Sequence, residues 1–184
     1  LQNIISQKNP FQYKEKDVIH LSYQILLGLQ KLLTLNYVHL DLKPENILVC
    51  CLNPVKIAII DLSFTENFEE TNGSKDKIQG TIGYISPEML LYKKFTRKTD
   101  IWSLGIIIYL LYTSSFIFGI EEEKYTNNIE FPENVSYLVN ASLNNLSLEL
   151  DNIITKCLVY NTINRISINN LIKLIDSIKE TYLN

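Results

Sequence analysis

The sequence predicts a mostly α-helical fold with one small β-hairpin. Several long stretches carry apolar residues at three- and four-residue spacing, which is the period of an amphipathic helix. Two short runs rich in β-branched residues, 47–51 and 55–60, flank Asn53 and Pro54, which are typical turn residues. With 184 residues and 46% hydrophobic content, the chain is long enough for one domain with a sizeable core.

The first helix is expected from about Asp17 to Leu35, where apolar residues recur on one face. Asn36 follows as a stop signal, because asparagine tolerates the left-handed conformation that ends many helices. After the hairpin, the segment 61–83 is polar and mixed in composition. We expect this segment to form an exposed loop.

Three further helices are expected in the second half of the chain. The apolar stretch 100–112 predicts a helix buried within the protein, and 150–158 and 168–178 show helical spacing. Ser167 is a suitable cap for the last helix. The Asn-rich region 114–145 shows no clear period, because polar turn residues interrupt it.

Composition and charge narrow the class of protein. The net charge of -3 gives no electrostatic reason to expect nucleic acid as a partner. The apolar run 101–112 is too short to span a bilayer, which needs about 20 residues, and 1–10 lacks the pattern of a signal peptide. Cys50, Cys51 and Cys157 show no metal-ligand spacing, so we expect reduced, packed thiols. These features favour an intracellular protein, cytoplasmic or nuclear.

A polar cluster lies in the stretch 39–46, between the first expected helix and the hairpin. Asp41, Lys43 and Asn46 place a carboxylate, an ammonium and an amide close together. Transfer of phosphate from ATP to a hydroxyl requires a carboxylate to accept the proton, a cation beside the transferred charge, and oxygen ligands for Mg²⁺. Asp61 lies 20 residues after Asp41, and the hairpin should return it alongside the cluster. We therefore expect these residues to face a common cleft.

The cluster resembles the catalytic loop of eukaryotic-type serine/threonine protein kinases. Three further features match that family in order along the chain. The stretch 80–88 resembles the end of the activation segment, with Ser86 in place of the usual alanine, and 100–105 resembles the start of the central helix. Arg165 resembles the arginine that pairs with the glutamate ending that segment, here Glu88. The resemblance extends over nearly the whole chain.

The resemblance implies a protein-kinase-like fold, C-lobe only, over residues 1–184. No Gly-rich phosphate loop and no strand lysine precede Leu1, so the N-lobe is expected to be absent from this chain. The implied function is ATP-dependent phosphorylation of serine or threonine hydroxyls on protein substrates, with ATP and Mg²⁺ as cofactors and a regulatory protein as a further partner. The alternative is a catalytically impaired, pseudokinase-like lobe that acts as a protein-binding module, which the missing N-lobe and Ser63 favour.

Carried over residue by residue, the resemblance assigns the chemistry to the polar cluster. Asp41 would be the catalytic base, and Lys43 would contact the transferred phosphate. Asn46 and Asp61 would bind Mg²⁺. Thr81, in the substrate-facing loop, would hydrogen-bond both Asp41 and Lys43, as in serine/threonine rather than tyrosine kinases. The residues expected to contact bound ATP and its metal are Lys43, Glu45, Asn46, Leu48 and Asp61.

Other matching positions are expected to serve the scaffold. Leu48 would form the floor under adenine, and His39 would stack with Leu62 in the hydrophobic column that links the two lobes. The Asp100 carboxylate would accept backbone hydrogen bonds from the catalytic loop. Glu45 would favour basic residues near the target hydroxyl. The residues expected to have structural roles are His39, Leu62, Glu88, Asp100, Trp102 and Arg165.

The sequence departs from the family pattern at several positions. Leu40 replaces the arginine that binds a phosphorylated activation segment, and Lys77 stands where the family commonly carries its phosphorylated threonine. We therefore predict that activity does not depend on a phosphate there. Ser63 replaces the glycine of the Asp-Phe-Gly motif, which restricts a backbone hinge. The stretch 114–118 replaces the usual Gly-x-x-Pro-Phe, which puts nearby substrate docking in question.

Overall fold

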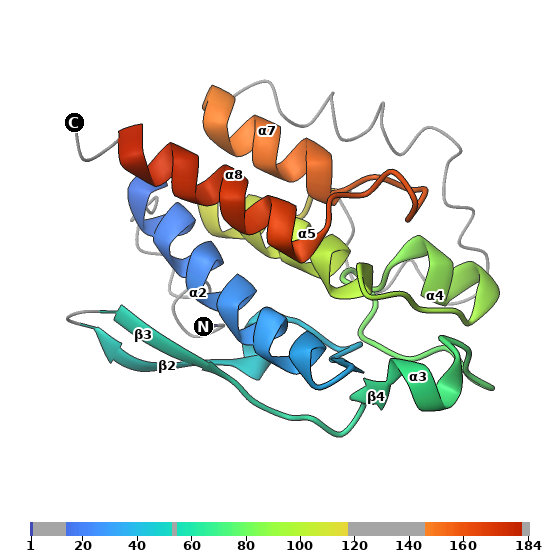
Figure 1. The fold of residues 1–184 in the computed structure, drawn as a ribbon. Helices are drawn as coiled ribbons and strands as arrows, with labels where there is room; N and C mark the ends of the chain where they lie inside the picture. The colour runs from blue at the N-terminus through green and yellow to red at the C-terminus, as the bar shows by residue number, and fades with distance from the viewer. Residues whose placement is uncertain (2–13, 53–54, 118–145, 182–184) are drawn as a thin grey trace.

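The computed structural model describes residue 1 and residues 14–52, 55–117 and 146–181 (Figure 1). Within these ranges the chain is mostly helical with a small antiparallel hairpin, so the predicted fold class is confirmed. The expected turn at Asn53 and Pro54 lies outside the described residues. The elements are α2 (Glu15–Thr34), β1 (Tyr37–Val38), η1 (Pro44–Asn46), β2 (Ile47–Leu52), β3 (Val55–Ile59), β4 (Glu66–Asn67), α3 (Phe68–Thr71), α4 (Pro87–Tyr92), α5 (Thr99–Thr113), α7 (Leu148–Cys157) and α8 (Ile168–Thr181).

Helix α5 forms the centre of the main hydrophobic core. Its residues are buried from Thr99 to Leu111, which agrees with the continuous apolar sequence, since a helix that is hydrophobic on all sides must be enclosed by protein. Helices α2 and α7 pack against α5. Gly105 permits the close contact with α7, because a Cβ at this position would lie only 2.7 Å from the Cβ of Cys157.

Helices α2, α7 and α8 are amphipathic, and each buries one face. The helical period predicted these faces, and the described bounds agree with the expected ones to within a few residues. Asn36 has φ 62 and follows the C-cap residue of α2, Leu35, which confirms it as the stop. The Ser167 hydroxyl accepts a hydrogen bond from the Asn170 backbone N–H at 3.3 Å, as expected of a cap. The buried apolar residues of these helices include Val18, Leu21, Ile25, Leu29, Leu150, Ile153, Ile154, Leu171 and Ile175.

The segment 61–83, expected to be an irregular loop, contains regular structure. Strand β4 pairs antiparallel with β1, and Tyr37 lies opposite Asn67. Asn67 also caps α3, because its side-chain oxygen accepts hydrogen bonds from the backbone N–H groups of Glu69 and Glu70 at 3.0 and 3.2 Å. The expectation of a loop was therefore wrong for 66–71, because the β1 partner of this stretch is distant in sequence, whereas most of the remaining segment has no regular structure.

The cysteines differ in their environments, although all three are free thiols. Cys157 is fully buried, and this burial raises the pKa of its thiol to about 12. Cys50 and Cys51 are exposed on β2, at a bulge that interrupts the pairing with β3. The expectation of packed thiols is therefore confirmed for Cys157 and wrong for the other two, which lie exposed on the hairpin. No helix in the described ranges is both long and apolar enough to cross a membrane.

Candidate active site

The stretch 39–46 is held in place by the start of α5. The backbone N–H groups of His39 and Leu40 donate hydrogen bonds to the two carboxylate oxygens of Asp100 at 2.8 and 2.9 Å. These are the backbone hydrogen bonds that were expected of Asp100. Burial raises the pKa of the Asp100 carboxyl, although the two donors favour the charged form.

Asp41, Lys43 and Thr81 form a closed triangle of polar contacts. The Thr81 hydroxyl donates to Asp41 Oδ1 at 2.6 Å, and the Lys43 ammonium donates to the Thr81 hydroxyl at 2.7 Å. Lys43 Nζ also lies 3.1 Å from Asp41 Oδ2. Both hydrogen bonds expected of Thr81 are therefore present. The side-chain amide of Asn46 donates to the Asp41 backbone carbonyl at 2.9 Å and to Asp41 Oδ2 at 3.2 Å.

Gly80 allows the loop that carries Thr81 to approach the catalytic stretch. It has φ 111, a backbone conformation that residues other than glycine rarely adopt. A Cβ at this position would also lie 2.8 Å from the Leu40 carbonyl oxygen. A larger residue would therefore push Thr81 away from Asp41.

The hairpin brings Asp61 back beside the cluster, as the sequence predicted. The Ile60 backbone N–H donates to the Asn46 carbonyl at 2.9 Å, and the Ile60 carbonyl lies 3.3 Å from His39 Nε2. Asp61 has φ 60, and its carboxylate accepts a hydrogen bond from the Ser63 hydroxyl at 2.6 Å. The hydrogen bonds from the Ser63 side chain and backbone lower the pKa of the Asp61 carboxyl, which is therefore ionised at neutral pH.

Two non-glycine residues with positive φ flank this cluster, namely Leu40 (φ 68) and Asp61 (φ 60). A bulky side chain in this region of backbone conformation is strained, and such strain is concentrated at functional sites. The hydrogen bonds around both positions keep the backbone in this conformation. The strain supports a functional role for the cluster, independently of any family resemblance.

The oxygen atoms that could act as metal ligands at this site suit a hard divalent cation. Asn46 uses its side-chain N–H group as donor, and its Oδ1 atom accepts none of the hydrogen bonds found in the described ranges. Asp61 supplies ionised carboxylate oxygens. Among the described residues no three His, Cys, Asp or Glu side chains form a metal-binding group. Mg²⁺ is commonly bound by one or two protein groups together with substrate phosphates and water, so Asn46 and Asp61 fit this ion.

Glu88 and Arg165 form a buried ion pair, as expected. The guanidinium nitrogens Nη1 and Nη2 donate to Oε1 and Oε2 of the carboxylate at 2.8 and 2.9 Å. The guanidinium also lies over the ring of Trp102, with its central carbon 5.3 Å from the ring centroid. Trp102 is fully buried. The pair joins α4, at the end of the segment 61–88, to the loop before α8.

His39 and Leu62, which were expected to stack in a hydrophobic column, differ in their exposure. His39 is buried, but Leu62 is 53% exposed and lies outside both hydrophobic clusters of the described residues. Leu48 is half exposed on the hairpin and Glu45 is exposed, so both are accessible to a ligand.

Two features that position the segment 61–88 could not be read from the sequence. Lys75 forms an ion pair with Glu66, nine residues earlier. Leu40, only 5% exposed, belongs to a small apolar cluster beneath the segment. The members of this cluster are Val38, Leu40, Ile85, Met89 and Phe95. The replacement of arginine by leucine was visible in the sequence, but the cluster that accepts the leucine was not, because its members are far apart along the chain.

Comparisons with known proteins agree with this geometry. The family model described as "Protein kinase domain" matches residues 1–174. Over 128 residues the chain is 37% identical to serine/threonine-protein kinase 17A from Oryctolagus cuniculus, a match that covers 68% of this chain and 32% of that protein. Over 110 residues it is 43% identical to calcium-dependent protein kinase 4 from Plasmodium falciparum, covering 59% of this chain and 20% of that protein.

A third relative, calcium-dependent protein kinase 6 from Plasmodium berghei, is 37% identical over 123 residues, which cover 66% of this chain and 8% of that protein. The chain belongs to the protein kinase domain family. It spans about a third or less of the length of these three relatives.

Proposed function

We propose that this chain is the C-lobe of a serine/threonine protein kinase, which transfers the γ-phosphate of ATP to a hydroxyl of a protein substrate. The observation that carries the proposal is the triangle of Asp41, Lys43 and Thr81, joined by Asn46. Phosphoryl transfer depends on positioned charges rather than on covalent chemistry by the protein. A buried carboxylate beside an ammonium group satisfies that requirement.

Each residue has a distinct part in the proposed reaction. Asp41 orients the substrate hydroxyl and accepts its proton. Lys43 places its positive charge beside the transferred phosphoryl group, and Thr81 keeps Lys43 and Asp41 in register. Asn46 and Asp61 would bind Mg²⁺, which, when bound, neutralises the charge on the phosphate oxygens. Leu48 and Glu45 would contact the nucleotide, as proposed from the resemblance.

We further propose that the segment 61–88 is ordered without phosphorylation. The buried Leu40 and the ion pair between Lys75 and Glu66 anchor the segment by apolar and charged contacts of its own. Alanine at Thr71 and at Ser74 should therefore leave turnover unchanged. A loss of turnover in either variant, restored by a phosphate-mimicking aspartate, would contradict this part of the proposal.

One observation favours a second function, that of a protein-binding module without catalysis. The Ser63 hydroxyl occupies one oxygen of the Asp61 carboxylate at 2.6 Å, and this oxygen would otherwise be available to a metal ion. If this hydrogen bond persists in the presence of Mg²⁺ and ATP, only the other oxygen of the Asp61 carboxylate is left for the metal ion, which would weaken metal binding. Measurement of Mg²⁺-dependent nucleotide binding, with and without Ser63→Gly, distinguishes the two functions.

The direct test of the first function is transfer of labelled γ-phosphate from ATP to a serine/threonine peptide library. The assay should use the product of the gene with whatever coding region precedes Leu1. Asp41→Asn should lower turnover by at least about 100-fold, because general-base catalysis contributes that much or more. Asp76→Asn removes an exposed carboxylate from the segment 61–88, outside the catalytic cluster, and serves as the matched control. Unchanged turnover in Asp41→Asn would remove Asp41 from the role of base.

A further inference from the structure

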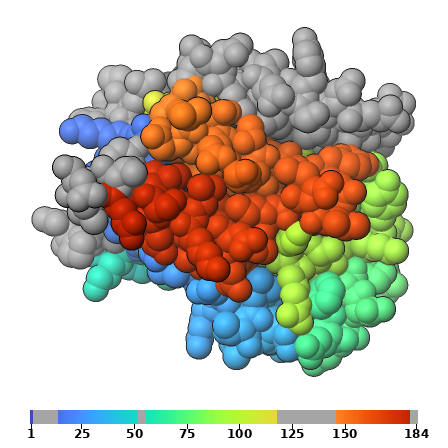
Figure 2. Space-filling model, turned by 45° about the horizontal axis from the view of Figure 1, so that its top comes forward, coloured from blue at the N-terminus to red at the C-terminus, as the bar shows by residue number. Residues whose placement is uncertain are grey.

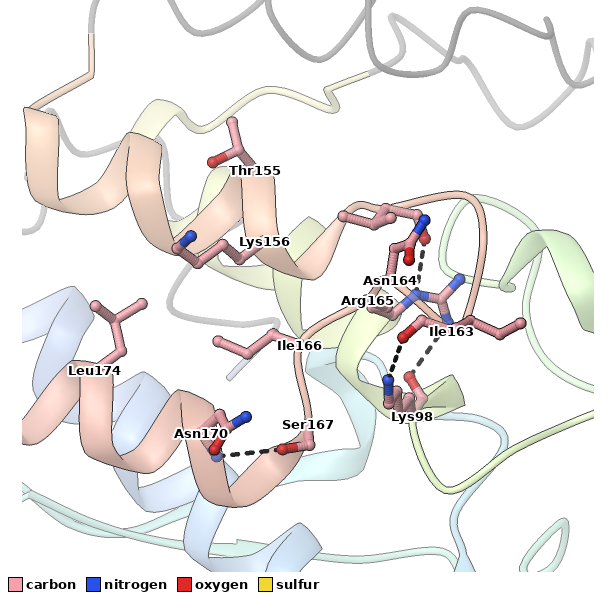
Figure 3. Close-up of a pocket in the computed structure, with 11 residues that line it drawn as sticks. Lys98, Thr155, Lys156, Ile163, Asn164, Arg165, Ile166, Ser167, Asn170 and Leu174 are labelled. Carbon is pink, nitrogen blue, oxygen red and sulfur yellow. Dashed lines mark hydrogen bonds between the residues drawn. The ribbon is translucent and has the colours of Figure 1, made fainter.

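A groove of about 780 Å³ lies where α7, α8 and the loop 158–167 meet, and it is open to solvent. Figure 2 shows α8 and α7 side by side on one face of the molecule, in red and orange, with their connecting loop reaching toward the green region that includes α4. Figure 3 shows the residues that line the groove. Apart from Arg165, which pairs with Glu88, none of them is a residue of the candidate active site, so the proposed function leaves this groove unexplained.

Two of the three cations that line the groove have no carboxylate partner among the described residues. Its lining contains Lys98, Lys156 and Arg165 and no Asp or Glu. The Arg165 guanidinium is neutralised by Glu88. The Lys98 ammonium donates to the Ile163 backbone carbonyl at 2.9 Å, which leaves its charge uncompensated. In the described part of the chain, Lys156 is exposed and its ammonium has neither an ion-pair nor a hydrogen-bond partner.

Apolar side chains lie between the cations. Ile163 is 81% exposed, the highest value among the large hydrophobic residues of the described ranges. Ile166 and Leu174 are half-buried and also line the groove. In the view of Figure 3, Ile166 lies between Lys156 and Lys98. The groove therefore presents several apolar side chains next to lysine ammonium groups, and an apolar patch bordered by polar groups is a feature of interaction sites.

We propose that this groove binds an acidic peptide segment of a partner protein, one that carries an apolar side chain next to its carboxylates. Carboxylates of the peptide would pair with Lys98 and Lys156, and its apolar side chain would cover Ile163 and Ile166. The two cations lie on different elements, so an extended ligand matches their arrangement. A nucleic acid is disfavoured, because two free lysines on a protein of net charge -3 provide little affinity for a phosphate backbone.

The proposal is tested by fluorescence anisotropy with the 184-residue chain and a labelled hexapeptide, Glu-Asp-Leu-Glu-Leu-Glu. Lys98→Gln and Lys156→Gln should each weaken binding by about two- to fivefold, because partly exposed ion pairs have modest strength. Binding should also weaken as NaCl concentration rises. A peptide with Gln and Asn in place of Glu and Asp should bind more weakly still. Lys56→Gln, which removes the same charge from the exposed hairpin, is the matched control and should bind as the unmodified chain does.

Ile163→Glu provides a second variant that does not depend on the lysines. This position is already exposed, so the fold should be retained, and the added negative charge should repel the acidic peptide. Equal affinity of the unmodified chain and the Lys98→Gln/Lys156→Gln double variant would overturn the proposal. Equal weakening by Lys56→Gln would also overturn it, because attraction would then come from overall charge. Displacement of the peptide by a single-stranded oligonucleotide at lower concentration than by unlabelled peptide would instead identify a nucleic-acid site.

Discussion

Replacement of Arg165 by methionine should destabilise the chain more than most single substitutions. The guanidinium is fully buried and donates to both oxygens of Glu88 at 2.8 and 2.9 Å. It also donates to the backbone carbonyls of Val159 and Lys98 at 2.9 and 3.2 Å. Without Arg165, the hydroxyl of Thr99 at 2.8 Å is the hydrogen-bond donor that remains to the Glu88 carboxylate among the described side chains.

The expected magnitude follows from this burial. Removal of one partner from a buried ion pair costs about 3–5 kcal/mol, because the other charge stays desolvated and unpaired. Domains are stable by only about 5–15 kcal/mol, so Arg165→Met should consume a large share of the free energy of unfolding. The double variant Arg165→Met/Glu88→Met removes both charges, so its cost should fall below the sum of the two single substitutions.

Urea denaturation followed by the fluorescence of Trp102 measures these costs, because the chain has a single tryptophan and it is buried. Unfolding should also be followed by far-UV circular dichroism, because Arg165 lies over the indole ring and its loss by itself alters the emission of Trp102. Arg97→Met is the control: its pair with Glu69 is exposed, at 3.4 Å, and should contribute less than about 1 kcal/mol. A cost for Arg165→Met no greater than that of the control would refute the reasoning.

Three further predictions concern packing, thiol reactivity and the proposed metal ligand. Leu40→Ala should lower the free energy of unfolding by about 2–4 kcal/mol in urea titrations, whereas exposed Leu62→Ala should cost under about 1 kcal/mol; similar costs would contradict the burial of Leu40. At about pH 8, Ellman's reagent should modify the two cysteines of β2 in the native chain and Cys157 only after denaturation, because the buried thiol has a pKa of about 12 and stays protonated. Fast reaction of all three thiols in the native chain would argue against the burial of Cys157. Ser63→Gly should raise the pKa of Asp61 toward its ordinary value, because a side-chain donor to the carboxylate is lost; an NMR titration with no upward shift would exclude this hydrogen bond as the cause.

Much of the fold and of the candidate site could be predicted because the relevant signals are local. The helical periods of α2, α7 and α8 fixed their buried faces, and Asn36 and Ser167 marked two helix ends. The cluster from Asp41 to Asn46 could be recognised because its residues lie close together in the sequence. Even the approach of Asp61 followed from local structure, since a hairpin necessarily returns the chain to its starting edge.

The tertiary structure alone decided which side chains meet across long stretches of sequence. The exposure of Leu62, the burial of Leu40 and the pairing of β4 with β1 depend on contacts between residues that are distant along the chain. The groove between α7 and α8 is of the same kind, since Lys98 reaches it from before α5. Hydrophobic periodicity and capping residues indicate the secondary structure of one segment at a time. The burial of a side chain and the balance of its charge depend on how the segments pack together.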